Sequence, residues 1–164
     1  MYKRQIFPSE TVFFDRVLNL EKVTHPLRNS VRSEWYRLAL DATATCEIIF
    51  CDPDNGIAGR DEKLRSGKGA KSVGRDEIAG FHARGQTVVV YHHADRSASV
   101  SEQSARRTNE LRETLGTDDV FALRFARGTT RLYFVAPSPH HSNLIRDRAN
   151  ALVSGPWGQH FSFS

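Results

Sequence analysis

The sequence is poor in cysteine, with two in 164 residues. Cys46 and Cys51 differ by an odd number of positions, so on a straight strand they face opposite sides and cannot bridge each other. We therefore expect buried free thiols, as is usual in a reducing compartment, and a fold that holds without a disulfide.

Long apolar runs are also absent. No stretch approaches the ~20 residues that a membrane-spanning helix needs, and no signal peptide or lipidation motif is visible. Internal repeats and low-complexity tracts are missing as well. With 39% hydrophobic and 26% charged residues, the chain is an ordinary globular one, large enough for one core and too small for two. We expect a single cytoplasmic domain with no membrane partner.

Charge of one sign is in small excess, since 23 Lys and Arg against 19 Asp and Glu give a net charge of +4. The initial residues, Met-Tyr-Lys-Arg-Gln, match the translation of a sequencing-library transposon end read from a GTG start codon. We therefore expect residues 1–5 to be an adapter artefact and residues 6–164 to be a single α/β domain truncated at its N-terminus. Without Lys3 and Arg4 the net charge falls from +4 to +2, a weak sign of a nucleic-acid partner.

What the sequence does contain is an alternation of short apolar runs with amphipathic segments, which is typical of α/β proteins. Helices are predicted where apolar residues recur at helical spacing and where caps close the ends, as Ser99 with Glu102 and Gly116 do. The expected fold is a three-layer Rossmann-like one, with a mostly parallel sheet that ends in an antiparallel hairpin. The predicted strands are 11–14, 47–51, 87–92, 120–125, 132–135 and an edge strand within 157–161, and the predicted helices are 30–41, 75–83, 99–115 and one that starts at Ser138-Pro139.

The most informative stretch is an apolar run after residue 47 that delivers Asp52, Asp54 and Asn55 into a turn. A continuous β-branched and aromatic run suits an interior strand of a parallel sheet, and ligands of open α/β sheets gather beyond the carboxyl ends of such strands. The next parallel strand ends at His92 and His93 after one helical crossover, so we expect the two strand tips to be neighbours. Because side chains alternate along a strand, one of the two histidines faces the site, and we favour His93.

The predicted catalytic residues are Asp52, Asp54, Asn55 and His93. The two carboxylates are hard oxygen ligands that suit Mg²⁺ or Mn²⁺, and a neutral imidazole can act as a general base. Asp-Pro and Asn-Gly dipeptides are also ordinary turn formers, so the same stretch is compatible with a purely structural turn.

Lys71, Arg96 and Glu77 are the predicted substrate-binding residues. The two cations can neutralise a phosphate or a developing anion, whereas Glu77 is equally compatible with an exposed helix position. Residues 57–70 are glycine-rich, charged and without periodicity, which predicts a mobile loop beside the acidic turn, either a lid or a tolerated insertion. Within it, Gly67-Lys68-Gly69 lacks the spacing of a Walker motif.

The order of elements from Glu47 to Val135 resembles the C-terminal half of Rossmann-like S-adenosylmethionine-dependent methyltransferases. In that family a strand ends in an Asp/Asn-Pro-Pro-Tyr-type loop, and the sheet closes with a reversed strand. Here Asp52-Pro53-Asp54-Asn55 stands in the place of that loop, with Asp54 for the second proline and Asn55 for the aromatic residue. The resemblance implies group transfer to a nucleotide or nucleic-acid substrate, with S-adenosylmethionine as cofactor and its glycine-rich loop N-terminal to this stretch. The two departures leave the base-holding role of the family's loop unsupported.

A second resemblance is to uncharacterised bacterial proteins with an Asp-Pro-Asp-Asn-Gly turn, a Lys-Tyr-Val-like segment with a nearby Glu, and a strand that ends in Tyr-Gln-His. The matching pieces here are Asp52–Gly56, Lys71–Val73 with Glu77, and Tyr91–His93 followed by Arg96. This resemblance runs from Trp35 onward and implies a longer parent chain, but no activity.

Two alternatives stay open beside the methyltransferase-like reading. A Mg²⁺- or Mn²⁺-dependent phosphoesterase or nuclease would use Asp52 and Asp54 as ligands, as the Asp-x-Asp turns of Toprim and haloacid-dehalogenase folds do. Gly56 replaces the Thr of the second family, and the upstream Glu-Gly of the first is not visible. The other alternative is a ligand-binding domain without catalysis.

Overall fold

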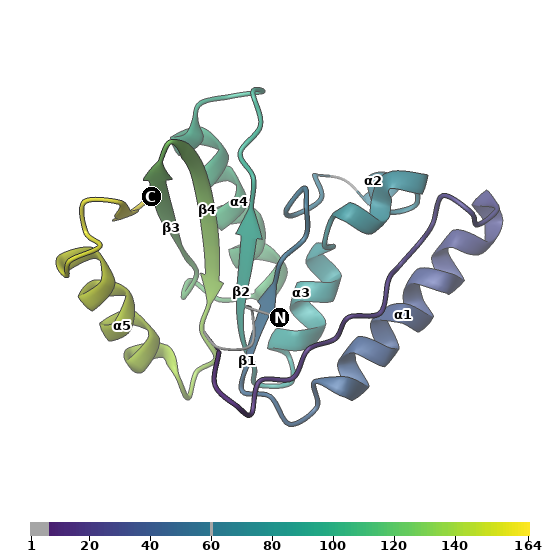
Figure 1. Cartoon of the computed structure of the whole chain (residues 1–164), viewed down its shortest axis with the longest axis horizontal. Coiled ribbons are helices and arrows are strands. Elements are labelled where there is room, and N and C mark those ends of the chain that lie inside the picture. The colour runs from purple at the N-terminus through teal and green to yellow at the C-terminus, as the bar shows by residue number, and fades with distance from the viewer. Residues whose placement is uncertain (1–6, 60) are drawn as a thin grey trace.

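The computed structural model describes residues 7–59 and 61–164 (Figure 1). The interpretation of residues 1–5 as an adapter artefact lies outside these residues. None of the described helices is long and apolar enough to cross a lipid bilayer. In chain order the elements are η2 (His25–Leu27), α1 (Arg28–Ala42), β1 (Ile48–Cys51), α2 (Asp61–Leu64), η3 (Gly67–Lys71), α3 (Arg75–His82), β2 (Thr87–His92), α4 (Val100–Leu115), β3 (Phe121–Arg127), β4 (Thr129–Ala136), α5 (Ser142–Ser154) and β5 (Phe161–Phe163).

The strands form one open mixed sheet in the order β1-β2-β4-β3-β5. β1 and β2 run parallel, whereas β2–β4, β4–β3 and β3–β5 are antiparallel pairs. The prediction of an α/β fold is confirmed, but the prediction of a mostly parallel sheet is wrong for the strands that the structure describes. The reason is that the second strand of the β3–β4 hairpin, which must reverse direction, pairs directly with β2.

Apolar side chains of the sheet alternate between two cores. The core under α3 and α4 holds the inward side chains of β1 and β2, and the core on the other face lies under α5, at the left of Figure 1. The two cores form because successive side chains of a strand point to opposite faces of the sheet. The first core contains Ile49, Val88 and Val90 with Ile78, Phe81 and Leu111, and the second contains Phe121, Leu123 and Val135 with Ala149.

The capping signals of α4 are confirmed. The Ser99 hydroxyl accepts the Glu102 N–H (3.2 Å), and the Glu102 carboxylate accepts the Ser99 N–H (2.9 Å). Gly116 ends the helix in the left-handed region, with φ of 64°. Helices α1 and α3, strands β1 and β2 and the β3–β4 hairpin also lie in the predicted regions. An edge strand is present, but β5 begins at Phe161, where the predicted region 157–161 ends.

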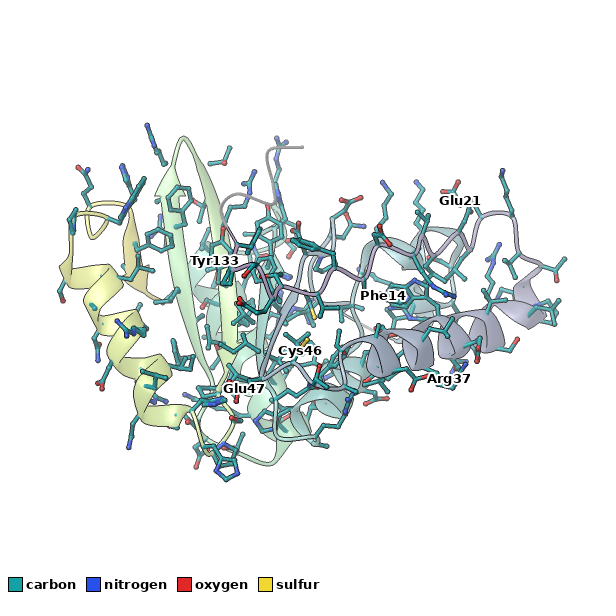
Figure 2. All side chains as sticks on the ribbon, turned by 60° about the horizontal axis from the view of Figure 1, so that its bottom comes forward. Phe14, Glu21, Arg37, Cys46, Glu47 and Tyr133 are labelled. Carbon is teal, nitrogen blue, oxygen red and sulfur yellow. The ribbon has the colours of Figure 1, made fainter. Side chains whose placement is uncertain are left out.

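The predicted strand at residues 11–14 is wrong, because this stretch has irregular backbone. Phe14 packs edge-to-face on Trp35 of α1 with ring centroids 5.4 Å apart, and the Trp35 indole N–H donates to the Arg16 carbonyl (2.7 Å). Figure 2 shows Phe14 between this segment and α1. Apolar residues that pack on a helix need no neighbouring strand, so strand-like composition was misleading here.

The last helix begins at Ser142, later than the Ser138-Pro139 signal predicts. Ser138 is fully buried, and its N–H donates to the Thr87 hydroxyl (3.0 Å). It therefore fastens the segment after β4 to the start of β2, and the helix forms only beyond this anchor.

Both cysteines are free thiols, as predicted, but they are half-buried. Cys46 lies in the connection before β1 (Figure 2), and Cys51 ends that strand. Burial raises the pKa of the Cys51 thiol to about 12, so this thiol stays protonated at neutral pH.

A buried ion pair joins α1 to α3 and to the segment between α2 and α3. The Arg32 guanidinium donates to both Glu77 carboxylate oxygens (2.7 and 2.8 Å) and to the carbonyls of Gly69 (2.9 Å) and Ser72 (2.7 Å). The two side chains are 10% and 12% exposed. Because four acceptor atoms surround one guanidinium, the pair fixes the connection between β1 and β2 to α1.

Replacing Arg32 by Met should lower the free energy of unfolding by about 3–5 kcal/mol, because Glu77 would keep a buried charge without its partner. Arg37→Met, on the same helix, is the matched control. Its ion pairs with Glu34 and Asp41 are exposed and should cost less than about 1 kcal/mol. Urea denaturation measures both variants, and equal losses would contradict the structural role assigned to Arg32.

Candidate functional site

The turn after β1 meets His92 and His93 at the C-terminal ends of the parallel strands β1 and β2. Cys51 at the end of β1 pairs with Val90 in the parallel strand β2, so both strands end side by side, as the sequence predicts. A polar cavity of about 430 Å³ lies at this edge. Its lining residues are Asp54, Asn55, Ile57, Ala58, Gly59, Lys63, Ser72, His92, His93, Asp95 and Arg107.

The turn after β1 is held by backbone hydrogen bonds to the segment that precedes α3. The N–H of Asn55 donates to the Lys71 carbonyl (2.8 Å) and that of Ala58 to the Val73 carbonyl (2.9 Å). In return the Val73 N–H donates to the Gly56 carbonyl (3.1 Å). These hydrogen bonds hold the turn after β1 against residues 71–73 beside the cavity. The segment between them, which was expected to be a mobile loop, contains the helices α2 and η3.

His92 forms the floor of the cavity. The residue is 5% exposed, and its ring lies edge-to-face against Phe134, with centroids 5.5 Å apart. The Ile57 N–H donates to the His92 Nδ1 (3.0 Å). The neutral ring therefore carries its proton on Nε2, as a hydrogen-bond donor. Burial, and then the nearby Arg107 cation, lower the pKa of His92 to about 4.

Gly56 makes this contact possible. It has φ of 74°, and a Cβ there would lie 2.2 Å from His92 Nδ1. A side chain at position 56 would therefore strain the turn and also displace the imidazole. The glycine of the Asp-Pro-Asp-Asn-Gly turn is thus required by its packing against His92.

Gly56→Ala should destabilise the protein by more than Gly128→Ala. Gly128, in the β3–β4 hairpin, has the same φ of 74°, but no atom lies within 4 Å of a Cβ built there. The control should cost about 1–2 kcal/mol from backbone strain alone, and Gly56→Ala at least about 1 kcal/mol more. Urea denaturation compares the two, and equal costs would show that the Gly56–His92 contact is not tight.

The loop after β2 is shaped by Gln103 of α4. Its side-chain oxygen accepts the Asp95 N–H (3.1 Å), and its amide donates to the carbonyls of Asp95 (2.9 Å) and Ala98 (2.8 Å). The Asp95 carboxylate accepts the N–H (2.8 Å) and hydroxyl (2.5 Å) of Ser97, which lower the pKa of Asp95. Asp95 is therefore a fixed anion at the cavity wall.

Arg107 of α4 also lines the cavity, and its side chain is 12% exposed. Its Nη1 donates to the Glu110 carboxylate (2.5 Å), while its buried Nε has no hydrogen-bond acceptor among the described residues. The guanidinium packs on the backbone of Gly59, where a Cβ would lie 3.1 Å from Nη2. The cavity thus combines a partly satisfied guanidinium with a neutral imidazole.

Three of the four predicted catalytic residues, Asp54, Asn55 and His93, line the cavity. Asp52 does not line it. Burial raises the pKa of Tyr133, whose side chain packs on the core under α5, and the charges of Tyr91 and then Asp52 add to this rise. Asp52 and Asp54 therefore do not converge in the cavity.

The predicted substrate-binding residues lie outside the cavity lining. Lys71 pairs with Asp54 at 3.4 Å on the exposed rim, and Arg96 is exposed in the loop after β2. Glu77 is engaged with Arg32 and also accepts the Gly74 N–H (2.8 Å) at the start of α3. Its position is explained by this structural role.

Sequence reasoning missed Arg107, Asp95, Lys63 and Ser72, and it favoured His93 over His92. Both histidines line the cavity, because β2 ends at His92 and strand alternation no longer applies to the next residue. Arg107 lies far from the turn in sequence, on a helix whose pattern shows only an amphipathic face. Among the described side chains, no group of three His, Cys, Asp or Glu is placed to hold a metal ion.

Comparison of the chain with protein-family models, with curated proteins and with solved structures finds no match. The geometry of the cavity is therefore the basis for assigning a function.

Stability should depend on pH through His92. With a folded-state pKa of about 4 against 6.5 for the free side chain, the folded protein binds fewer protons than the unfolded chain between these values. The free energy of unfolding should therefore be highest above pH 6.5 and should fall as the pH is lowered toward 4. The total loss from His92 should be on the order of 3 kcal/mol.

His92→Asn should flatten the dependence of unfolding free energy on pH in this window, because the Asn oxygen can accept the Ile57 N–H without titrating. His93→Asn, which removes an exposed neighbouring histidine, should leave it unchanged. Urea denaturation at several pH values measures both, and parallel curves for His92→Asn and the unaltered protein would rule out His92 as the titrating group.

Proposed function

We propose that this chain is a Rossmann-like enzyme domain that binds a nucleotide-class substrate in the strand-end cavity and takes part in methyltransferase-like group transfer. The observation that carries the proposal is the polar cavity of about 430 Å³ beyond the carboxyl ends of two adjacent parallel strands. That edge is where open α/β sheets bind their ligands. The volume is within the range of small-molecule sites.

The order of strands supports the methyltransferase-like part of the proposal. The reversed strand β4 lies between β2 and β3, and the Asp-Pro turn follows β1. A reversed strand and a turn of this kind at a strand end are the two features on which the resemblance to methyltransferases rests. Helices that pack on both faces of the sheet are consistent with the three-layer form of the fold.

The lining residues suit the handling of an amine or hydroxyl nucleophile. Asn55 and Asp54 can accept hydrogen bonds from such a group and orient it, and His93, at the mouth of the cavity, can take up its proton. His92 cannot serve as this base, since its Nδ1 accepts the Ile57 N–H and its Nε2 carries the proton. It acts as a hydrogen-bond donor to the substrate instead.

S-adenosylmethionine is the cofactor that the proposal implies, and when bound it supplies an electrophilic methyl group. The chemistry of the lining is compatible with it, because the carboxylates of Asp54 and Asp95 can accept hydrogen bonds from ribose hydroxyls or an ammonium group. Gly67–Gly69, a weak phosphate signal in the sequence, belongs to η3 and does not line the cavity.

The arrangement gives less support to a Mg²⁺- or Mn²⁺-dependent phosphoesterase. That reaction needs Asp52 and Asp54 as joint ligands, and only Asp54 lines the cavity. Asp54 is also paired with Lys71 at 3.4 Å, which reduces its negative field. The group-transfer reading is therefore the one to test first.

Isothermal titration calorimetry with S-adenosylmethionine, a nucleoside monophosphate, Mg²⁺ and Mn²⁺ tests the proposal. We expect the cofactor or the nucleotide to bind, and Asn55→Ala to weaken that binding by about tenfold through loss of a hydrogen bond to the ligand. Asn150→Ala, at an exposed position of α5, should have no effect. Metal binding that is lost in Asp54→Ala would favour phosphoester chemistry, and ligand binding without any transferase turnover would favour a non-catalytic domain.

A further inference from the structure

Arg107 has hydrogen-bonding capacity that the described residues do not use. Its guanidinium offers five N–H donors, and the hydrogen bond from Nη1 to Glu110 engages one of them. Nε is buried and has no acceptor among the described residues. A buried donor without a partner costs about 1–3 kcal/mol, so this guanidinium is incompletely satisfied, and an acceptor in the cavity would reach its terminal nitrogens and not the buried Nε.

Gly59 shapes the approach to this guanidinium. A Cβ on Gly59 would lie 3.1 Å from Nη2, closer than nearly all such contacts, so the bare backbone lets the guanidinium lie against the turn. Arg107 is thereby held against Gly59, three residues after the last residue of the Asp-Pro-Asp-Asn-Gly turn, in the same cavity lining as Ile57 and Ala58. The Arg107 guanidinium is therefore positioned by its packing on Gly59 and by its hydrogen bond to Glu110.

His92 supplies a second, independent donor. It is 95% buried, since 5% is exposed, and it lines the cavity. Its Nδ1 is occupied by the Ile57 N–H, so its remaining polar group is the Nε2–H, which has no acceptor among the described residues. A neutral donor adjacent to a cation suits an anionic oxygen, because both groups favour negative charge.

The carboxylates near the cavity are already engaged. Asp54 pairs with Lys71, Asp95 accepts two hydrogen bonds from Ser97, and Glu110 pairs with Arg107. Lys63, on α2, adds a further cation to the lining. Asp54 and Asp95 keep their negative charge in the lining, so the groups available to an anion are Arg107, the Nε2–H of His92 and Lys63.

We propose that Arg107, the Nε2–H of His92 and Lys63 form an anion subsite, which binds the phosphate group of a nucleotide-class substrate. This inference deepens the proposed function and rests on it. The subsite would fix one end of the substrate near Arg107, while Asn55 and His93 act on the other end. It assigns a substrate-binding role to Arg107 in place of the predicted Arg96.

A bound phosphate would change the titration of His92. The charged groups that face this ring are Arg107, Asp95, His93 and Arg106, of which only Asp95 favours the imidazolium form. A phosphate at Nε2 adds negative charge and partly offsets Arg107, so it should raise the pKa of His92 from about 4 toward its ordinary value. This signature is absent if Arg107 has a purely structural role.

The test measures the affinity of the full chain for inorganic phosphate, a nucleoside monophosphate, the parent nucleoside and S-adenosylmethionine. Arg107→Gln should weaken binding of phosphate and nucleotide by about tenfold or more, and should change nucleoside binding by less than about twofold. Arg106→Gln is the control, because it removes the same charge from the next, exposed position of α4. Phosphate binding that Arg107→Gln and Arg106→Gln weaken equally would overturn the subsite.

A second measurement does not depend on any variant. In the unaltered protein, phosphate should shift the His92 ring resonances and raise their titration midpoint. If the nucleoside binds but phosphate leaves His92 unmoved, the subsite is refuted and the proposed function stands. If S-adenosylmethionine, and not phosphate, depends on Arg107, the anion is a cofactor carboxylate and the phosphate assignment is wrong. If none of the four compounds binds, the proposed function fails together with the subsite.

Discussion

The contact between the turn after β1 and the buried ring of His92 is the constraint on which the site depends. The Ile57 N–H donates to His92 Nδ1 at 3.0 Å, and Gly56 leaves room for the ring because it has no Cβ. One hydrogen bond and one close approach thereby join the ends of two parallel strands. They fix the histidine tautomer, and they decide that the imidazole presents a donor to the cavity.

Strand alternation then divides the neighbouring side chains between the two faces of the sheet. His92 continues the face of Val88 and Val90, whereas Tyr91 lies edge-to-face against Tyr133, which packs on the core under α5. Asp52, just after β1, does not line the cavity, whereas Asp54 does. The two aspartates of the turn therefore lie in different environments, which argues against a metal site that uses both as ligands.

The sequence predicted the strands β1 and β2, the capped helix α4 and the meeting of the turn with the histidines, because these depend on local patterns and on one crossover. It did not predict Arg107 or the role of Glu77, since the contacts of both residues are set by tertiary packing between distant helices. The strand expected at residues 11–14 failed for a related reason: its aromatic side chains found a helix to pack on, and composition does not distinguish a helix from a strand as a partner. The roles of Asp54, Asn55 and His93 in catalysis stay predictions.

The most direct test of the account is the tautomer of His92 in solution. A proton–nitrogen NMR correlation of the histidine rings at neutral pH, assigned with His92→Asn, distinguishes a protonated Nε2 from a protonated Nδ1. The account predicts a single Nε2–H tautomer whose Nδ1 accepts the Ile57 N–H. A protonated Nδ1, or a ring that exchanges between the two tautomers, would contradict it, because the turn and the end of β2 would then not be joined as one site.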